Sequence, residues 1–90
     1  MIIKSKAVSG TMESNDIFVE IEPCQKGVEV EIQSIVFNQF GKQIENTIKD
    51  VLNSFNVDNA LVRVNDRGAV DCTIRARVET ALKRAANEVK

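Results

Sequence analysis

The sequence predicts an α+β fold, in which a four-stranded, mostly antiparallel sheet carries two helices on one of its faces. Three observations lead to this prediction. Apolar and polar residues alternate over several short runs, apolar residues recur every three or four positions over two long runs, and these runs follow in the order β-β-β-α-β-α. With 90 residues and 43% hydrophobic content, the chain has the size and composition of a single domain, residues 1–90.

The first half of the chain contains three predicted strands. Residues 1–8 form a short apolar run, and residues 17–22 alternate apolar and polar positions until Pro23 ends them. Residues 28–34 show the clearest alternation of the whole sequence. The short connection through Gly27 predicts that the second and third strands form an antiparallel hairpin with their glutamates facing water.

A long amphipathic helix follows these strands. Its apolar positions recur at steps of three and four and include the phenylalanines Phe37, Phe40 and Phe55, which we expect in the core. Ser34 is a predicted N-cap, and Asn56 suits the left-handed position that closes a helix.

The last part of the chain predicts a fourth strand and a second helix. Residues 60–66 alternate and end in a turn-prone segment. The residues after Val70 alternate for a few positions, but a helical stripe fits a far longer span, so we predict a helix from about Ala69 to Val89. Charges of alternating sign at a spacing of four support a helix surface there.

Charge and composition argue against several classes of function. Twelve basic and thirteen acidic residues are spread along the chain, and the aromatics are four phenylalanines, so nucleic-acid binding has neither a basic stripe nor a stacking platform. The apolar runs are too short to span a bilayer, and the first residues do not resemble a signal peptide. We therefore expect no nucleic-acid or membrane partner and a cytoplasmic location.

The inventory of reactive side chains is also narrow. Histidine is absent, which removes the commonest general base and every nucleophile that depends on one. Cys24 and Cys72 are too few for a zinc site, and we expect both as reduced thiols, with Cys72 packed as a small apolar residue. The composition favours a domain that other proteins act upon.

The segment AVSGTMESND, Ala7–Asp16, connects the first two predicted strands. It is longer than the two to five residues or so that a hairpin loop takes. It contains the hydroxyls of Ser9, Thr11 and Ser14, and on the residues alone a plain loop that turns at Asn15 and Asp16 is the favoured interpretation.

This segment resembles the attachment segment of the acyl carrier protein subunit (gamma chain) of bacterial citrate lyase. The family pattern runs approximately Ala-x-Ala/Ser-Gly-Thr-x-Glu-Ser-x-Asp. The stretches NQFGKQIENTIKDVLNSFNV and DRGAVDCTIRARVE also resemble that family, so the resemblance covers nearly the full chain in order. The carrier subunit of malonate decarboxylase is a less close match.

The resemblance implies that Ser14 carries a 2'-(5''-phosphoribosyl)-3'-dephospho-CoA group through a phosphodiester. It implies that the thiol of this group holds acetyl and citryl thioesters while citrate is cleaved to oxaloacetate and acetate. The alpha and beta subunits of citrate lyase would perform these steps, and a separate transferase would attach the group. Ser9 stands where members of that family can have alanine, which makes it a poor candidate, and Thr11 matches a family threonine that is not the modified residue. The chain itself would then be a non-catalytic carrier.

Three neighbours of Ser14 have predicted supporting roles. Gly10 can adopt backbone angles that bend the loop outward. Glu13 and Asp16 either help to hold a divalent ion or mark the loop for the transferase; alternatively, Asp16 caps the turn and Glu13 is merely solvated.

A local excess of basic residues leaves two interpretations open. These side chains either contact phosphates or acidic partner surfaces or, as we favour, pair with local carboxylates. The residues are Arg63, Arg67, Arg75 and Arg77.

Two classes of function compete with a covalently modified carrier. One is a non-covalent adaptor that uses its sheet edge or its arginines, for which Ser14→Ala would remain fully active. The other is a small enzyme built on Cys24 or Cys72, which requires a thiol with a depressed pKa.

Overall fold

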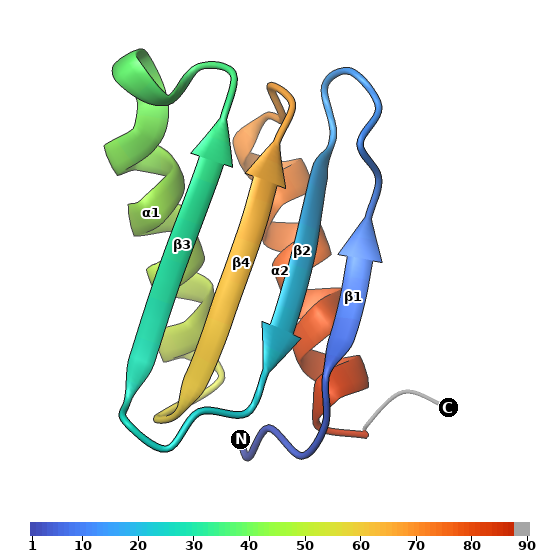
Figure 1. Ribbon diagram of the computed structural model, residues 1–90, viewed down its shortest axis with the longest axis vertical. Helices are drawn as coiled ribbons and strands as arrows, with labels where there is room; N and C mark the ends of the chain where they lie inside the picture. Colours follow the sequence, from blue (N-terminus) through green and yellow to red (C-terminus); the bar gives the residue numbers. More distant parts are fainter. Residues whose placement is uncertain (88–90) are drawn as a thin grey trace.

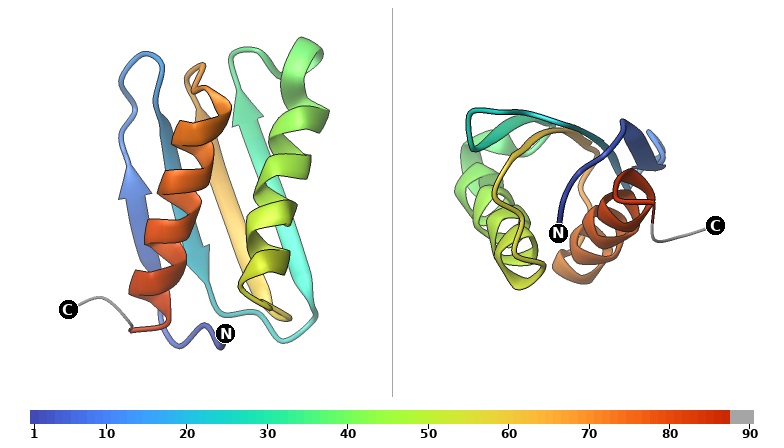
Figure 2. Two further views of the ribbon diagram at one scale, coloured as in Figure 1. Left: turned by 180° about the vertical axis from the view of Figure 1, so that it is seen from behind. Right: turned by 90° about the horizontal axis from the view of Figure 1, so that it is seen from below.

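The computed structural model describes residues 1–87, and over this range it has a four-stranded sheet covered on one face by two helices (Figures 1 and 2). The predicted α+β class and the order of elements are confirmed. The elements are β1 (Ala7–Gly10), β2 (Ile17–Glu22), β3 (Val28–Ser34), α1 (Phe37–Ser54), β4 (Ala60–Asp66) and α2 (Asp71–Ala85).

The sheet is mixed, with the strand order β1-β2-β4-β3. β1 pairs with β2 and β2 with β4 in antiparallel fashion, whereas β3 pairs with β4 in parallel. The predicted β2–β3 hairpin is therefore wrong, because β4 lies between these two strands. The reason is burial: Ala60, Val62 and Val64 are at most 4% exposed, so β4 takes a central place, and α1 provides the crossover that a parallel pair requires.

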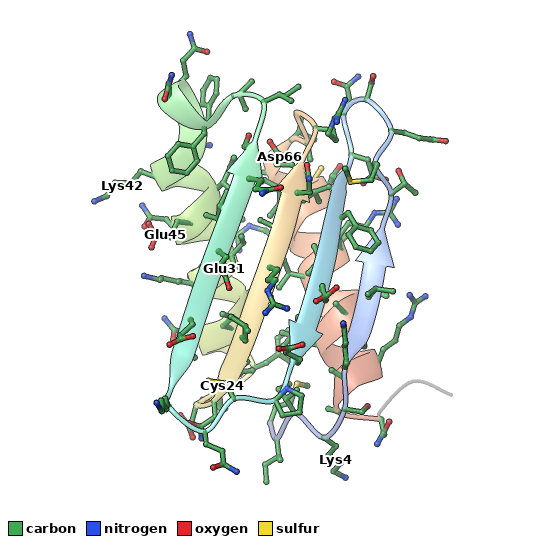
Figure 3. The ribbon with its side chains drawn as sticks, viewed as in Figure 1. Lys4, Cys24, Glu31, Lys42, Glu45 and Asp66 are labelled. Atoms are coloured by element: carbon green, nitrogen blue, oxygen red, sulfur yellow. The ribbon has the colours of Figure 1, made fainter. Side chains whose placement is uncertain are left out.

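The hydrophobic core lies between the sheet and the helices. Alternate residues of β2 and β4 point towards the helices, as do the apolar stripes of α1 and α2. The other face of the sheet is polar: Arg63 forms ion pairs with Glu20 (3.0 Å), Glu22 (3.5 Å) and Glu31 (3.4 Å). Figure 3 shows Glu31 on this open face, so the prediction that the glutamates face water is confirmed.

The first strand is shorter and later than predicted. It begins at Ala7, because the preceding backbone bonds to the end of α2: the amides of Lys4 and Ser5 both donate to the Ala85 carbonyl, at 2.9 and 3.1 Å. Ile3 is 7% exposed and completes the core beneath this junction.

The helix ends differ from the predicted ones in two places. Ser34 is not an N-cap, because it closes β3 and its hydroxyl donates to Asp66 Oδ2 (2.8 Å); α1 begins after Val36. Asn56 does adopt the predicted left-handed conformation, with φ of 54°. The second helix begins at Asp71 rather than at Ala69, and the predicted end at Val89 lies outside the described residues.

Three apolar residues expected in the core are exposed instead. Phe37 and Phe40 are 51% and 47% exposed, because the first turns of α1 extend beyond the end of β3 (Figure 1). Cys72 is exposed because the buried stripe of α2 runs through Ile74 and Val78. Phe55 does pack against the core.

Within residues 1–87, no helix is both long and apolar enough to cross a bilayer. Cys24 and Cys72 are free thiols, as predicted.

Candidate functional site

The loop between β1 and β2, residues 11–16, lies at the end of the sheet where β4 runs into α2 (Figure 1). Two backbone hydrogen bonds join these segments. The Asn15 amide donates to the Arg67 carbonyl (2.8 Å), and the Arg67 amide donates to the Asp16 carbonyl (2.8 Å). These two bonds hold the end of the loop, at Asn15 and Asp16, against the connection between β4 and α2.

Ser14 occupies the tip of a tight turn within this loop. The Asp16 amide donates to the Glu13 carbonyl (3.2 Å), which places Ser14 and Asn15 at the two central positions. Asn15 has φ of 66°, the positive value that the second central position of a type II turn requires. The Ser14 side chain is exposed, and its hydroxyl forms no hydrogen bond within residues 1–87.

The other two hydroxyls of the segment are engaged or covered. Ser9 lies in β1 and is 4% exposed. The Thr11 hydroxyl donates to Asp16 Oδ2 at 2.6 Å and accepts a hydrogen bond from the Glu13 amide at 3.2 Å. Of the three candidates, Ser14 is therefore the one that an external enzyme can reach without unfolding the loop.

Asp16 anchors the loop to α2. Its carboxylate accepts bonds from the Thr11 hydroxyl, from the Ile17 amide (2.8 Å) and from both Nε (3.0 Å) and Nη2 (2.9 Å) of Arg77. The residue is 8% exposed. The hydrogen bond from Thr11, followed by that from Arg77, lowers the pKa of Asp16 from 3.8 to about 2. This geometry favours the capping role of Asp16 over that of a cation ligand.

The pKa of Asp16 leads to a prediction about acid stability. Because the folded pKa is depressed, the ionised form stabilises the fold above the unfolded pKa of 3.8, and this stabilisation is lost as the pH falls towards 2. Asp16→Asn is expected to lower the unfolding free energy at neutral pH, and the gap to wild type is expected to shrink by about 2 kcal/mol between pH 6 and pH 2. Urea unfolding of both proteins at several pH values in this range measures the difference in unfolding free energy. A gap that stays constant would contradict the role given to Asp16.

Gly10 ends β1, whereas Glu13 lies in the loop. Gly10 has φ of +89°, and a Cβ at this position would lie 1.8 Å from the Ile17 carbonyl oxygen, so the two strand ends approach as closely as only glycine permits. The Glu13 side chain is exposed. Among residues 1–87 no group of three or more Cys, Asp or Glu side chains is placed to hold a metal ion.

The four arginines separate into two kinds. Three of them have carboxylate partners: Arg63 on the open face, Arg75 with Asp50 (2.7 Å) and Asp71 (2.9 Å), and Arg77 with Asp16. The favoured interpretation is confirmed for these three.

Arg67 is the exception. Within residues 1–87 it forms no ion pair, and its Nε is buried without a hydrogen-bond partner. Its backbone is bonded to Asn15 and Asp16, the two residues that follow Ser14. The sequence did not distinguish this arginine from the others, because ion pairing depends on neighbours that only the fold defines.

The end of the molecule that bears Ser14 is also apolar. Exposed large hydrophobic side chains come from the loop itself, from the β3–α1 and β4–α2 connections and from the start of α1; they are Met12, Ile35, Phe37, Phe40 and Val70. A pocket of about 320 Å³ opens among these segments, between the first turns of α1 and α2. Sequence reasoning missed this surface because two of its residues had been placed in the core.

The described residues form a small α+β body with an exposed serine at the tip of a fixed turn, an arrangement that suits a carrier domain. Comparison with known proteins narrows this class. Residues 4–85 match the acyl carrier protein family model described as "Malonate decarboxylase delta subunit (MdcD)".

Named relatives agree with this match. The citrate lyase acyl carrier protein of Treponema denticola is 53% identical over 85 residues, which cover 94% of this chain and 97% of that protein. Those of Halothermothrix orenii and Escherichia fergusonii are 45% and 41% identical, covering 90% and 94% of their own lengths. The chain belongs to the family of acyl carrier proteins that includes these citrate lyase carriers.

A solved structure has the same fold. A chain from a Pseudomonas malonate decarboxylase hetero-tetramer in complex with malonate superposes with a TM-score of 0.81, at 23% identity, covering 92% of this chain and 86% of that one. Family membership confirms the expected resemblance and the role of a non-catalytic carrier; acyl carriers of this kind bear a prosthetic group.

Proposed function

We propose that this chain is the acyl carrier subunit of a citrate lyase complex, and that Ser14 bears 2'-(5''-phosphoribosyl)-3'-dephospho-CoA in phosphodiester linkage. The observation that carries the proposal is the exposed Ser14 hydroxyl at the tip of a turn held in place from both sides. The identity to citrate lyase carriers, 53% for the Treponema protein, favours citrate lyase over malonate decarboxylase, whose structural relative is 23% identical.

The residues around Ser14 fit a phosphodiester. Such a linkage adds a negative charge to the turn. Arg67, whose backbone is bonded to Asn15 and Asp16 in that turn, has no ion pair among the described residues. Arginine is well suited to phosphate oxygens because its guanidinium donates several hydrogen bonds from one plane. The two neighbouring carboxylates repel this charge to different extents. Asp16 is already neutralised by Arg77, whereas Glu13 points into solvent.

The residues of this chain position the prosthetic group and do not catalyse the reaction. When bound, the group supplies a thiol that carries acetyl and citryl groups as thioesters while the alpha and beta subunits exchange and cleave them. Thr11, Asp16 and Arg77 hold the base of the turn, so Ser14 keeps a fixed place on the body. A thiol tethered there stays at an effective concentration of order mM near any active site within reach. The free thiols of Cys24 and Cys72 fit a reducing compartment, and we place this function in the cytoplasm.

The proposed contact to Arg67 makes a prediction. Arg67→Gln removes a charge-assisted hydrogen bond of roughly 1.5–3 kcal/mol, so the transferase is expected to modify this variant about 10- to 100-fold less efficiently. Attachment rates from intact-mass time courses measure the effect. Arg63→Gln is the matched control, since it changes the same residue type in β4 at a site paired with glutamates. Equal attachment rates for the two variants would show that Arg67 does not contact the phosphodiester.

The proposed function is tested by intact-mass measurement of the chain produced together with its maturation enzymes. The expected result is one added prosthetic group, located on the peptide that contains Ser14. The modified chain is then mixed with citrate lyase alpha and beta subunits or with the malonate decarboxylase subunits. Citrate cleavage with the first set is the expected outcome; decarboxylation with the second would instead make the chain a malonate carrier. Stable partner binding by an unmodified, fully active chain would make it an adaptor.

A further inference from the structure

The pocket beside the Ser14 loop has mainly apolar walls. Its volume is about 320 Å³, within the range of small-ligand sites. The walls come from the start of α1, the first turns of α2 and the connection before α2. The apolar lining residues are Val36, Phe40, Ile44, Ala69, Val70 and Ile74. Phe40 and Val70 are 47% and 62% exposed, so these two side chains form its rim.

The pocket adjoins the turn that carries Ser14. Gly68 lines the pocket, and a Cβ at Gly68 would lie 3.7 Å from Asn15 Oδ1. Asn15 directly follows Ser14, and its amide bonds to Arg67, the neighbour of Gly68. A flexible group attached to Ser14 therefore starts next to one wall of the pocket.

The polar side chains of the pocket limit what can enter it. Asp66 is fully buried at the end of β4 (Figure 3), and its carboxylate accepts bonds from the Ser34 hydroxyl (2.8 Å) and the Ala69 amide (3.0 Å). Asp71 accepts bonds from the Thr47 hydroxyl (2.6 Å) and from Arg75 (2.9 Å).

The Thr47 bond, followed by the Arg75 bond, lowers the pKa of Asp71 and keeps this carboxylate ionised. Among residues 1–87, no lysine or arginine lines the pocket. A carboxylate or phosphate that entered would lose water beside two acidic side chains without meeting a cation, which is unfavourable. The pocket is suited to a small, uncharged and largely apolar group.

We propose that this pocket holds the acetyl-thioester end of the prosthetic arm when the carrier is away from its partner subunits. The inference rests on the proposed function, since the arm must be attached at Ser14. The acetyl group is small and neutral, as the walls require, whereas a citryl group brings carboxylates that Asp66 and Asp71 repel. Exchange of acetyl for citryl therefore empties the pocket, and the arm is free to reach the cleavage site. In the resting carrier, the pocket shields the thioester from water and nucleophiles.

Two variants alter the pocket while the fold is maintained. Val70 is the N-cap of α2, in an extended backbone conformation without a side-chain cap, and Asp or Asn is preferred at such a position. Val70→Asp brings a negative charge to the rim, and Val70→Asn is its uncharged control. Gln43→Trp fills the pocket from the exposed side of α1. Ile2→Asp changes a side chain that is 76% exposed and distant from the pocket lining.

The test uses the isolated, acetyl-loaded carrier and measures thioester cleavage by hydroxylamine at fixed pH, with acetyl-CoA as the unprotected reference. Methyl NMR signals of Ile44 and Ile74 report occupancy of the pocket. We expect the wild-type acetyl carrier to be cleaved at least about fivefold more slowly than acetyl-CoA, which corresponds to docking of four arms in five. The citryl-loaded form is expected to be cleaved without protection, with both methyl signals returned to their positions in the apo carrier.

The variants test whether the protection depends on the pocket. Val70→Asp and Gln43→Trp are expected to lose the protection, Val70→Asn to retain more of it than Val70→Asp, and Ile2→Asp to behave as wild type. Cleavage as fast as that of acetyl-CoA, with unshifted Ile44 and Ile74 signals, would overturn the inference. Shifts that appear only after partner subunits are added would overturn it as well, and would assign the pocket to those subunits. An unmodified Ser14 overturns the proposed function itself and is recognised beforehand from the mass spectrum.

Discussion

Ser14→Ala is expected to abolish attachment of the prosthetic group: incubated with the transferase and its donor, the wild-type chain gains the mass of one group and this variant gains none. The expectation is all-or-none because no neighbouring hydroxyl can substitute. Ser9 is buried in β1, and Thr11 is held by Asp16. A serine hydroxyl needs an external base to become a nucleophile, so only a side chain that fits into the transferase can react.

The matched control for this variant is Ser9→Ala, which removes a serine from the same segment. It is expected to gain the full mass, because Ser9 does not face solvent. Circular dichroism of the two variants before the reaction shows whether both are folded. The same added mass on Ser14→Ala as on wild type would disprove the assignment of the attachment residue.

Gly10→Ala, at the end of β1, is expected to lower the unfolding free energy by roughly 3–5 kcal/mol. Part of this cost is the left-handed backbone, about 1–2 kcal/mol for a residue with a Cβ. The remainder arises because the new Cβ would lie 1.8 Å from the Ile17 carbonyl oxygen, so the ends of β1 and β2 must separate. For a domain whose total stability is about 5–15 kcal/mol, this is a large fraction.

Gly27→Ala separates these two costs. Gly27 has φ of +93°, close to that of Gly10, but a Cβ there meets no atom within 4 Å. Its expected loss is therefore only about 1–2 kcal/mol. Urea unfolding of both variants measures the difference, and equal losses would show that the close approach of Gly10 to Ile17 does not matter. Slower modification of Ser14 in Gly10→Ala is expected to accompany the larger loss.

Local patterns predicted the elements of this fold but not which strands are neighbours. The alternation in residues 17–22 and 28–34 identified both strands, and their antiparallel directions are correct. The pattern does not reveal that β4 lies between them, because strand pairing depends on contacts between residues that are far apart in the sequence. The crossover through α1 makes that arrangement possible.

The errors about Phe37, Phe40 and Cys72 have a common cause. Periodicity shows which side of a helix is apolar, yet it does not show where the sheet beneath that helix ends. α1 begins beyond the end of β3, so its first two phenylalanines face solvent although they continue the stripe. The same error concealed the pocket, because Phe40 forms part of its rim.

The candidate site was predictable in part. Ser14 followed from the resemblance of one short segment, and Gly10 from its residue type. The buried bonds of Asp16 were not predictable, because its partner Arg77 is 61 positions away in the sequence. Nor did the sequence indicate that Arg67 has no carboxylate partner among residues 1–87.

The dependence of the Ser14 turn on distant residues has a consequence for the order of biosynthesis. Ser14 is translated early, but the turn that presents it is bonded to Arg67 and, through Asp16, to Arg77. These partners leave the ribosome only when most of the chain has been made. The proposed attachment site is therefore completed together with the domain. A transferase that recognises the formed turn would modify finished carriers rather than fragments or misfolded chains.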